Sequence, residues 1–207
     1  MATIDERIKH EIDWRVSEIS IIKSMPYLYP VSAAQRKVLV KHTIPVFYSL
    51  WEGFVADCFQ IYSHEINIQR IPADKICLPL VTHAIDTSLF LHQQRIEFDK
   101  KIKFVNDIQT YLNGDINLPT QVPTKSNVNF KVINQILTRF NLELLPDEPY
   151  KKSLDRLLFF RNKLAHGEFS IVIEQKNVDE MSDIVISSFH ILAERVVDGF
   201  NKKTYLR

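Results

Sequence analysis

Apolar residues recur every three or four positions along most of the chain, and this period predicts helices rather than strands. Thr3 and Glu6 have the spacing of a capping box, so a first helix should begin at Thr3. Pro26 and Pro30 should stop it. Its apolar stripe consists of Ile4, Ile8, Ile12, Val16, Ile19 and Ile22.

A second, unusually long helix is predicted from a second capping box at Ser32 and Gln35. The pattern continues to about Ile68, with Pro45 inside it, which should kink the helix or split it. The second half reads FYSLWEGFVADCFQIYSHEI and is dense in aromatic residues. We therefore expect this half to lie at the centre of the core.

The middle of the chain is less regular. Residues 70–96 contain two prolines and no clean period, which predicts short helices and turns. Residues 97–112 predict a helix with one apolar stripe, formed by Phe98, Ile102, Val105, Ile108 and Leu112. Residues 113–127 combine a glycine, two prolines and small polar residues, so they predict a loop. The loop is either an ordinary connector or a mobile segment near a ligand.

The last third of the chain predicts three more helices. Two of them should span residues 128–140 and 148–166, and the third should start at the pair Asn177 and Glu180 and run to about Phe200. The prediction is an all-α protein, a single bundle of about six to eight helices, with one domain over residues 1–207.

Composition and charge narrow the function classes. The net charge of +1 excludes a broad basic field for nucleic acid, but it leaves room for a local anion site. No apolar run is long enough to cross a membrane and the N-terminus lacks a signal peptide's apolar core, which favours a cytoplasmic protein. Cys58 and Cys77 form no CxxC and have no histidine at zinc-ligand spacing, so no metal or cofactor is expected.

The stretch RLLFFRNKLAHGEF, residues 156–169, carries an arginine among apolar residues. On a helix, Arg161 falls near the middle of an apolar arc of roughly 160°. The arc is formed by Leu154, Leu157, Leu158, Phe160, Leu164 and Ala165. Desolvating a guanidinium is costly, so Arg161 needs a partner. That partner is an internal carboxylate such as Glu52, a second copy of the chain, or an anionic ligand, and the residues alone leave this open.

Asn162 and His166 follow Arg161 and lie one helical turn apart from each other. Gly167 comes next, so His166 should occupy the last turn of the helix, where the carbonyl ends favour an imidazolium. A fixed cation, an amide and a histidine that can change charge near neutrality suit acid–base chemistry on a phosphate. The alternative is an exposed histidine that does no more than end a helix.

The sequence from Arg161 to His166 resembles the R-x4-6-H motif of HEPN domains, including the polar residue after the arginine. Trp51-Glu52-Gly53-Phe54 resembles a stretch on the long second helix of the RiboL-PSP or MAE-type HEPN branch. The resemblance extends over roughly residues 5–200.

That resemblance implies a fold, an activity and partners. HEPN domains are helical bundles that commonly form homodimers, in which two motif copies share a cleft. Active members are metal-independent endoribonucleases of toxin–antitoxin, antiphage and RNA-guided defence systems. The motif implies catalytic roles for Arg161 and His166, supported by Asn162, on an RNA substrate such as tRNA or mRNA, with an antitoxin or other defence-system protein as a partner. The same resemblance allows a non-catalytic module that binds RNA, a nucleotide or a protein.

Two further expectations concern the motif helix. Arg156 and Lys163 lie on it and could steer RNA, although a solvated polar face is the alternative. Arg161 and His166 are about 140° apart on one helix, so a two-fold axis beside the helix would be needed to place arginines and histidines in one cleft.

Overall fold

The computed structural model describes residues 2–89, 98–122, 127–168 and 171–207. Within these ranges the protein has seven α-helices, one 3-10 helix and no β-strand, so the predicted all-α class and the long second helix are confirmed. The helices are α1 (Ile4–Leu28), α2 (Ala33–Asn67), η1 (Ala73–Lys75), α3 (Leu78–Leu89), α4 (Phe98–Leu112), α5 (Phe130–Arg139), α6 (Asp147–Ala165) and α7 (Gln175–Asn201). Among the described helices, none has both the length and the apolar composition needed to cross a membrane.

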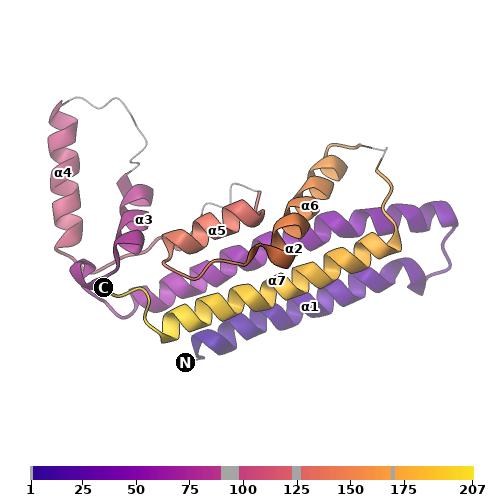
Figure 1. Cartoon of the computed structure of the whole chain (residues 1–207), viewed down its shortest axis with the longest axis horizontal. Helices are drawn as coiled ribbons and strands as arrows, with labels where there is room; N and C mark the ends of the chain where they lie inside the picture. The colour runs from indigo at the N-terminus through magenta and orange to yellow at the C-terminus, as the bar shows by residue number, and fades with distance from the viewer. Residues whose placement is uncertain (1, 90–97, 123–126, 169–170) are drawn as a thin grey trace.

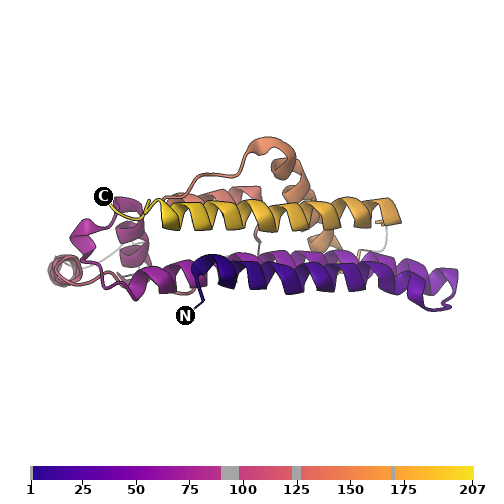
Figure 2. The same ribbon diagram turned by 90° about the horizontal axis from the view of Figure 1, so that it is seen from below.

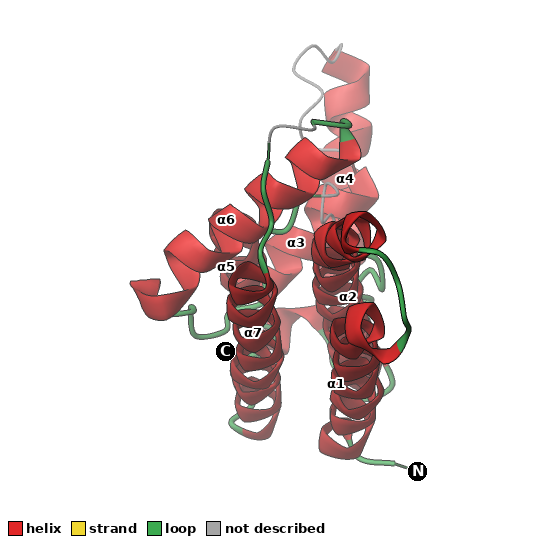
Figure 3. Cartoon of the chain, turned by 90° about the vertical axis from the view of Figure 1, so that its right-hand side faces the viewer, coloured by secondary structure: helices red, strands yellow, loops and turns green. Residues whose placement is uncertain are grey.

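Three long helices form the body of the molecule. α1, α2 and α7 lie side by side along its long axis, each in contact with the other two (Figures 1 and 2). α6 packs on α2 and α7 at an angle to both, as the end-on view shows (Figure 3). The α1–α2 turn lies at one end of the bundle, and α3 and α4 lie at the other (Figure 1). α2 is therefore the element that carries α6, and with it the RNKLAH motif.

Both predicted capping boxes form. Thr3 Oγ1 accepts a hydrogen bond from the Glu6 N–H, and the Glu6 carboxylate accepts one from the Thr3 N–H. Ser32 and Gln35 make the same pair of bonds at the start of α2. Each box satisfies two N–H groups that the first helical turn leaves without a partner, so these helix starts could be predicted from the sequence.

The predicted effects of two prolines were wrong. α1 runs through Pro26 to Leu28, because a proline in the last turn removes only one helical hydrogen bond. The helix ends at Tyr29, which precedes Pro30 and adopts an extended conformation with φ −120° and ψ 148°. Pro45 does not split α2, which continues as one 35-residue helix.

The start of the last helix was also predicted three residues too late. Glu174, rather than Asn177, is the N-cap: its side chain accepts from the Asn177 N–H while Asn177 Oδ1 accepts from the Glu174 N–H at 3.0 Å. Two overlapping pairs, Glu174–Asn177 and Asn177–Glu180, have the spacing of a capping box. The sequence favoured the second pair because asparagine is the commoner N-cap residue.

The aromatic half of α2 lies in the core, as predicted. Trp51, Phe54 and Phe59 are fully buried. Phe54 packs on Phe189 of α7 with ring centroids 4.7 Å apart, and Phe59 packs on Phe140 after α5 at 4.6 Å. These contacts, each favourable beyond the area they bury, fix α2 between α7 and the α5 region.

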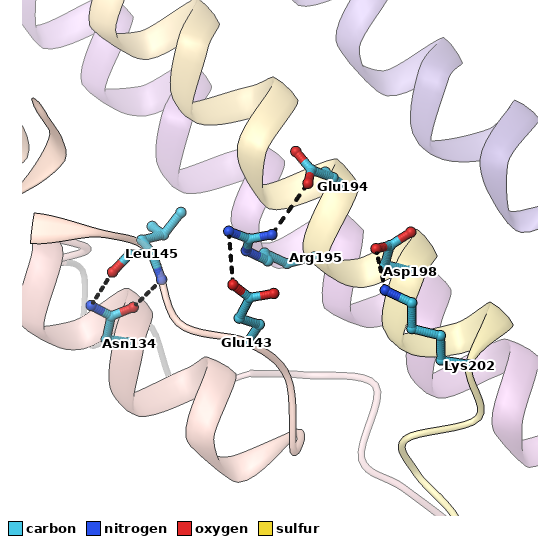
Figure 4. A network of polar contacts seen from close by, with 7 residues as sticks. All are labelled: Asn134, Glu143, Leu145, Glu194, Arg195, Asp198 and Lys202. Atoms are coloured by element: carbon cyan, nitrogen blue, oxygen red, sulfur yellow. Dashed lines mark hydrogen bonds and ion pairs between the residues drawn. The ribbon is translucent and has the colours of Figure 1, made fainter. Parts of the chain in front are cut away.

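The connection from α5 to α6 is fixed by a polar network against α7 (Figure 4). The Asn134 amide bonds both backbone groups of Leu145, accepting from its N–H at 2.9 Å and donating to its carbonyl at 3.5 Å. Glu143 in the same connection pairs with Arg195 of α7 at 3.2 Å. Since α6 begins two residues after Leu145, this network sets where the motif helix starts.

The predicted helix over residues 97–112 is present as α4, from Phe98, but much of its apolar stripe is not buried. Ile102 is 48% exposed, Val105 52% and Leu112 37%. The Phe98 side chain lies outside the described residues. The predicted loop 113–127 contains no helix in the ranges described, and residues 123–126 lie outside them.

Candidate functional site

Arg161 is held by three groups that together we call the Arg161 cluster: Tyr48 and Glu52 of α2, and Asn162. Its guanidinium carbon lies 4.4 Å from the centroid of the Tyr48 ring, within the range of a cation–π contact. Nη2 is 3.8 Å from Glu52 Oε2, and Nη1 donates to Asn162 Oδ1 at 2.8 Å. The side chain is still 23% exposed. The cluster therefore holds a cation that solvent, or an anion, can reach.

Tyr48 also connects the cluster to the segment that precedes α5. The Val128 N–H donates to the Tyr48 hydroxyl at 2.7 Å, and Trp51 Nε1 donates to the Val128 carbonyl at 2.9 Å. Burial raises the pKa of Tyr48 to about 12. The phenol is therefore protonated at neutral pH and cannot serve as a general base there.

The WEGF stretch has a separate task for each large side chain. Trp51 holds Val128, Glu52 faces Arg161, and Phe54 packs into the core. Trp51 and Glu52 are adjacent on α2 and project about 100° apart, so one helical turn fixes both the connector and the arginine.

His166 lies just beyond the last helical residue, as the C-cap of α6. Its N–H donates to the Asn162 carbonyl at 3.1 Å, and its side chain is exposed. Gly167 has φ +73°, the left-handed conformation that glycine adopts without steric cost. The N–H groups of Gly167 and Glu168 then bond the carbonyls of Leu164 and Lys163, which is a Schellman motif. The glycine thus ends the helix and leaves the imidazole in solvent.

Asn162 takes part in both halves of the motif. Its side chain accepts from Arg161 and its carbonyl accepts from the His166 backbone. The side chains of Arg161 and His166 nevertheless leave the helix about 140° apart. Arg161 faces α2, whereas His166 faces solvent.

The two cations predicted to contact RNA each have a carboxylate partner. Arg156 pairs with Glu180 of α7 at 3.0 Å, and Lys163 pairs with Glu168 at 2.6 Å. These contacts compensate part of their charge, so the structure favours neither as the main electrostatic contact for a phosphate. In the described ranges, no three His, Cys, Asp or Glu side chains converge as metal ligands would.

The sequence interpretation missed two residues beside the motif, Tyr48 and Lys41. Lys41 Nζ donates to the Glu168 carbonyl at 3.1 Å. Both residues lie on the same face of α2 as Glu52, at four and eleven positions before it, so helical spacing from Glu52 could have identified them.

Comparison with known proteins supports the resemblance in the motif. The family model described as MAE_28990-like HEPN matches residues 4–205, nearly the whole chain. The comparisons find no match among curated proteins and none among solved structures. HEPN domains form a family whose typical members are ribonucleases of defence and toxin–antitoxin systems. The chain belongs to the MAE_28990-like HEPN family.

Proposed function

We propose that this protein is a metal-independent endoribonuclease of a toxin–antitoxin or antiphage defence system. The observation that carries the proposal is an intact motif inside the matched family region: Arg161 is accessible and His166 is exposed at the end of its helix. A cation that is already saturated by carboxylates could not bind a phosphate, whereas Arg161 keeps part of its surface open.

The chemistry needs only groups that the motif contains. The ribose 2′-OH attacks the adjacent phosphorus and loses its proton to a base, while the P–O5′ bond breaks and the leaving 5′ oxygen gains a proton. The products are a 2′,3′-cyclic phosphate and a 5′-hydroxyl. His166 acts in proton transfer, and Arg161 faces the charge that develops on the non-bridging oxygens. Asn162 orients the guanidinium through its side chain.

The active unit is a homodimer. Because Arg161 and His166 diverge on one helix, a single copy does not aim both at one phosphate. A two-fold axis beside α6 would place Arg161 of one copy near His166 of the other, in a cleft formed by both motifs.

The test is cleavage of purified total RNA and tRNA in EDTA by the wild-type protein and by His166→Ala. We expect fragments with cyclic phosphate ends from the wild type and a loss of at least about 100-fold in the variant, the range for removing a general acid or base. Because His166 is exposed, the variant should fold like the wild type, which circular dichroism and thermal unfolding check. Equal cleavage by both proteins, or none by the wild type, would contradict the proposal; binding without cleavage would indicate a non-catalytic module.

A further inference from the structure

The α1–α2 end of the bundle carries an unusual distribution of charge. Residues 19–51 contain Lys23, Arg36, Lys37 and Lys41 but no Asp or Glu, although the chain as a whole has 25 acidic residues in 207. In the structure this stretch forms the end of α1, the turn and the first half of α2. That end reaches beyond the start of α7 (Figures 1 and 2). A chain that is nearly neutral overall thus has a local positive end.

A hollow of about 380 Å³ opens at this end, between the α1–α2 turn and the segment before α7. Two exposed cations line it, Arg36 and Lys37, and Glu174 is the acidic residue on its wall. The Glu174 carboxylate caps α7. Arg36 donates to the Pro26 carbonyl at 3.1 Å, and in the described ranges neither Arg36 nor Lys37 forms an ion pair.

Aromatic side chains accompany these cations. The Tyr27 ring lies 5.4 Å from the Arg36 guanidinium carbon and is 51% exposed, although its hydroxyl donates to Gln175 at 2.6 Å. Tyr29, in the turn, is 62% exposed. Exposed rings beside cations are the combination that binds single-stranded nucleic acid, because bases stack on the rings and phosphates contact the cations.

One stripe of α2 connects the hollow to the Arg161 cluster. Lys37, Lys41, Tyr48 and Glu52 fall within an arc of about 60° on the helix. Tyr48 and Glu52 contact Arg161, and Lys41 contacts the Glu168 carbonyl just after His166. Lys37 continues the stripe one turn further, at a helical rise of about 16 Å from Tyr48. The cation is therefore in line with the motif rather than elsewhere on the surface.

We propose that the α1–α2 end is a binding subsite for single-stranded RNA, in which Arg36 and Lys37 contact phosphates and Tyr27 and Tyr29 stack on bases of nucleotides that flank the cleaved bond. The subsite rests on the proposed ribonuclease function for its biological role. Its binding chemistry stands by itself. The occupant is RNA rather than a protein because an acid-free surface with two unpaired cations matches a polyanion best.

Binding should be measured by fluorescence anisotropy with fluorescein-labelled oligo(U) and oligo(A), over a series of KCl concentrations, in the His166→Ala background. Arg36→Gln/Lys37→Gln should bind about tenfold more weakly at low salt. The slope of log K against log salt should fall in magnitude by about 1.4, or 0.7 for each lost phosphate contact to a single strand. Tyr29→Ala should weaken binding to both homopolymers with little change in slope.

The matched control is Lys101→Gln/Lys103→Gln. It removes the same charge from exposed positions on α4, at the opposite end of the molecule (Figure 1). It should bind RNA as the His166→Ala parent does. Affinities and slopes that are the same for the two double variants would overturn the subsite, and so would a parent that binds no single-stranded RNA.

Two further results separate this inference from the proposed function. Cleavage by the wild type together with unchanged binding by Arg36→Gln/Lys37→Gln would refute only the subsite. Loss of binding in that variant without any wild-type cleavage would support the subsite and refute the ribonuclease. Light scattering distinguishes a protein occupant: a changed oligomeric state with unchanged RNA affinity would assign the surface to protein association and overturn the proposal.

Discussion

Two arginines lie against the same part of α2 and differ in how completely they are paired. Arg15 of α1 is 3% exposed, contacts Glu11 Oε2 at 2.6 Å and also pairs with Asp57. Arg161 of α6 is 23% exposed, and its carboxylate contact, Glu52, lies at 3.8 Å, too far for a hydrogen bond. Both also lie over an aromatic ring.

The difference separates a structural cation from one that can bind a ligand. Arg15 has two carboxylates and the Glu11 carbonyl as partners, so its charge is compensated inside the fold. Arg161 has a ring, an amide and a more distant carboxylate, which fix its position without closing its surface. From this comparison we expect that losing Arg15 impairs folding and that losing Arg161 impairs function.

The largest effect should come from Arg161→Met. RNA cleavage should fall by about 100- to 1,000-fold, the range for removing one group that stabilises developing charge. Stability should fall by only about 1 kcal/mol, because the lost contacts are a half-exposed, distant ion pair and a cation–π contact. Cleavage kinetics and urea unfolding measure the two quantities on the same preparation.

Mixing two inactive variants sharpens this prediction. If the site combines Arg161 of one copy with His166 of the other, a mixture of Arg161→Met and His166→Ala, refolded together, should regain part of the wild-type activity. Each variant refolded alone is the control. A mixture that stays inactive although mixed dimers form would rule out the composite site.

Arg15→Met should have the second largest effect, and on stability. We expect a loss of about 3 kcal/mol, at the lower end for breaking a buried ion pair because Glu11 and Asp57 are partly exposed and can regain water. Urea unfolding gives the value, and cleavage should be nearly unchanged where the variant is folded. A variant as stable as Arg161→Met would remove the distinction between the two arginines.

How far the sequence could predict the fold is clear from particular residues. The capping boxes at Thr3 and Ser32 depend on neighbours three positions away, so the sequence contains the whole signal. The end of α1 depends on how many helical bonds a proline removes, which the spacing alone does not reveal. The period of α4 predicted an apolar stripe correctly but could not say that Ile102 and Val105 would stay exposed, since burial requires a partner from elsewhere in the fold.

The candidate site divides in the same way. The order of Arg161, Asn162, His166 and Gly167 is local, and with it the helix end could be read from the chain. The approach of Tyr48 to Arg161 joins residues more than a hundred positions apart, and it depends on how α6 crosses α2. The partners of Arg156 and Lys163 could not be anticipated either, because helix α7 and the turn after α6 supply them.

The smallest effect should come from Tyr48→Phe, which keeps the ring under Arg161 and removes the hydroxyl. The buried N–H of Val128 then loses its acceptor, which should cost about 1–2 kcal/mol in urea unfolding, while cleavage stays close to wild type.

Tyr150→Phe is the matched control for this substitution. Its hydroxyl bonds the Ser187 hydroxyl at 2.8 Å rather than a backbone group. Ser187 can rotate toward water in the surface hollow that it lines, so the cost should be smaller than for Tyr48→Phe. A loss of cleavage in Tyr48→Phe as large as in Arg161→Met would mean that the hydroxyl, and not the ring, positions the arginine. Arg161 would then depend on its surroundings through a specific hydrogen-bonded contact, as Arg15 does, and the contrast between the two arginines would reduce to their exposure.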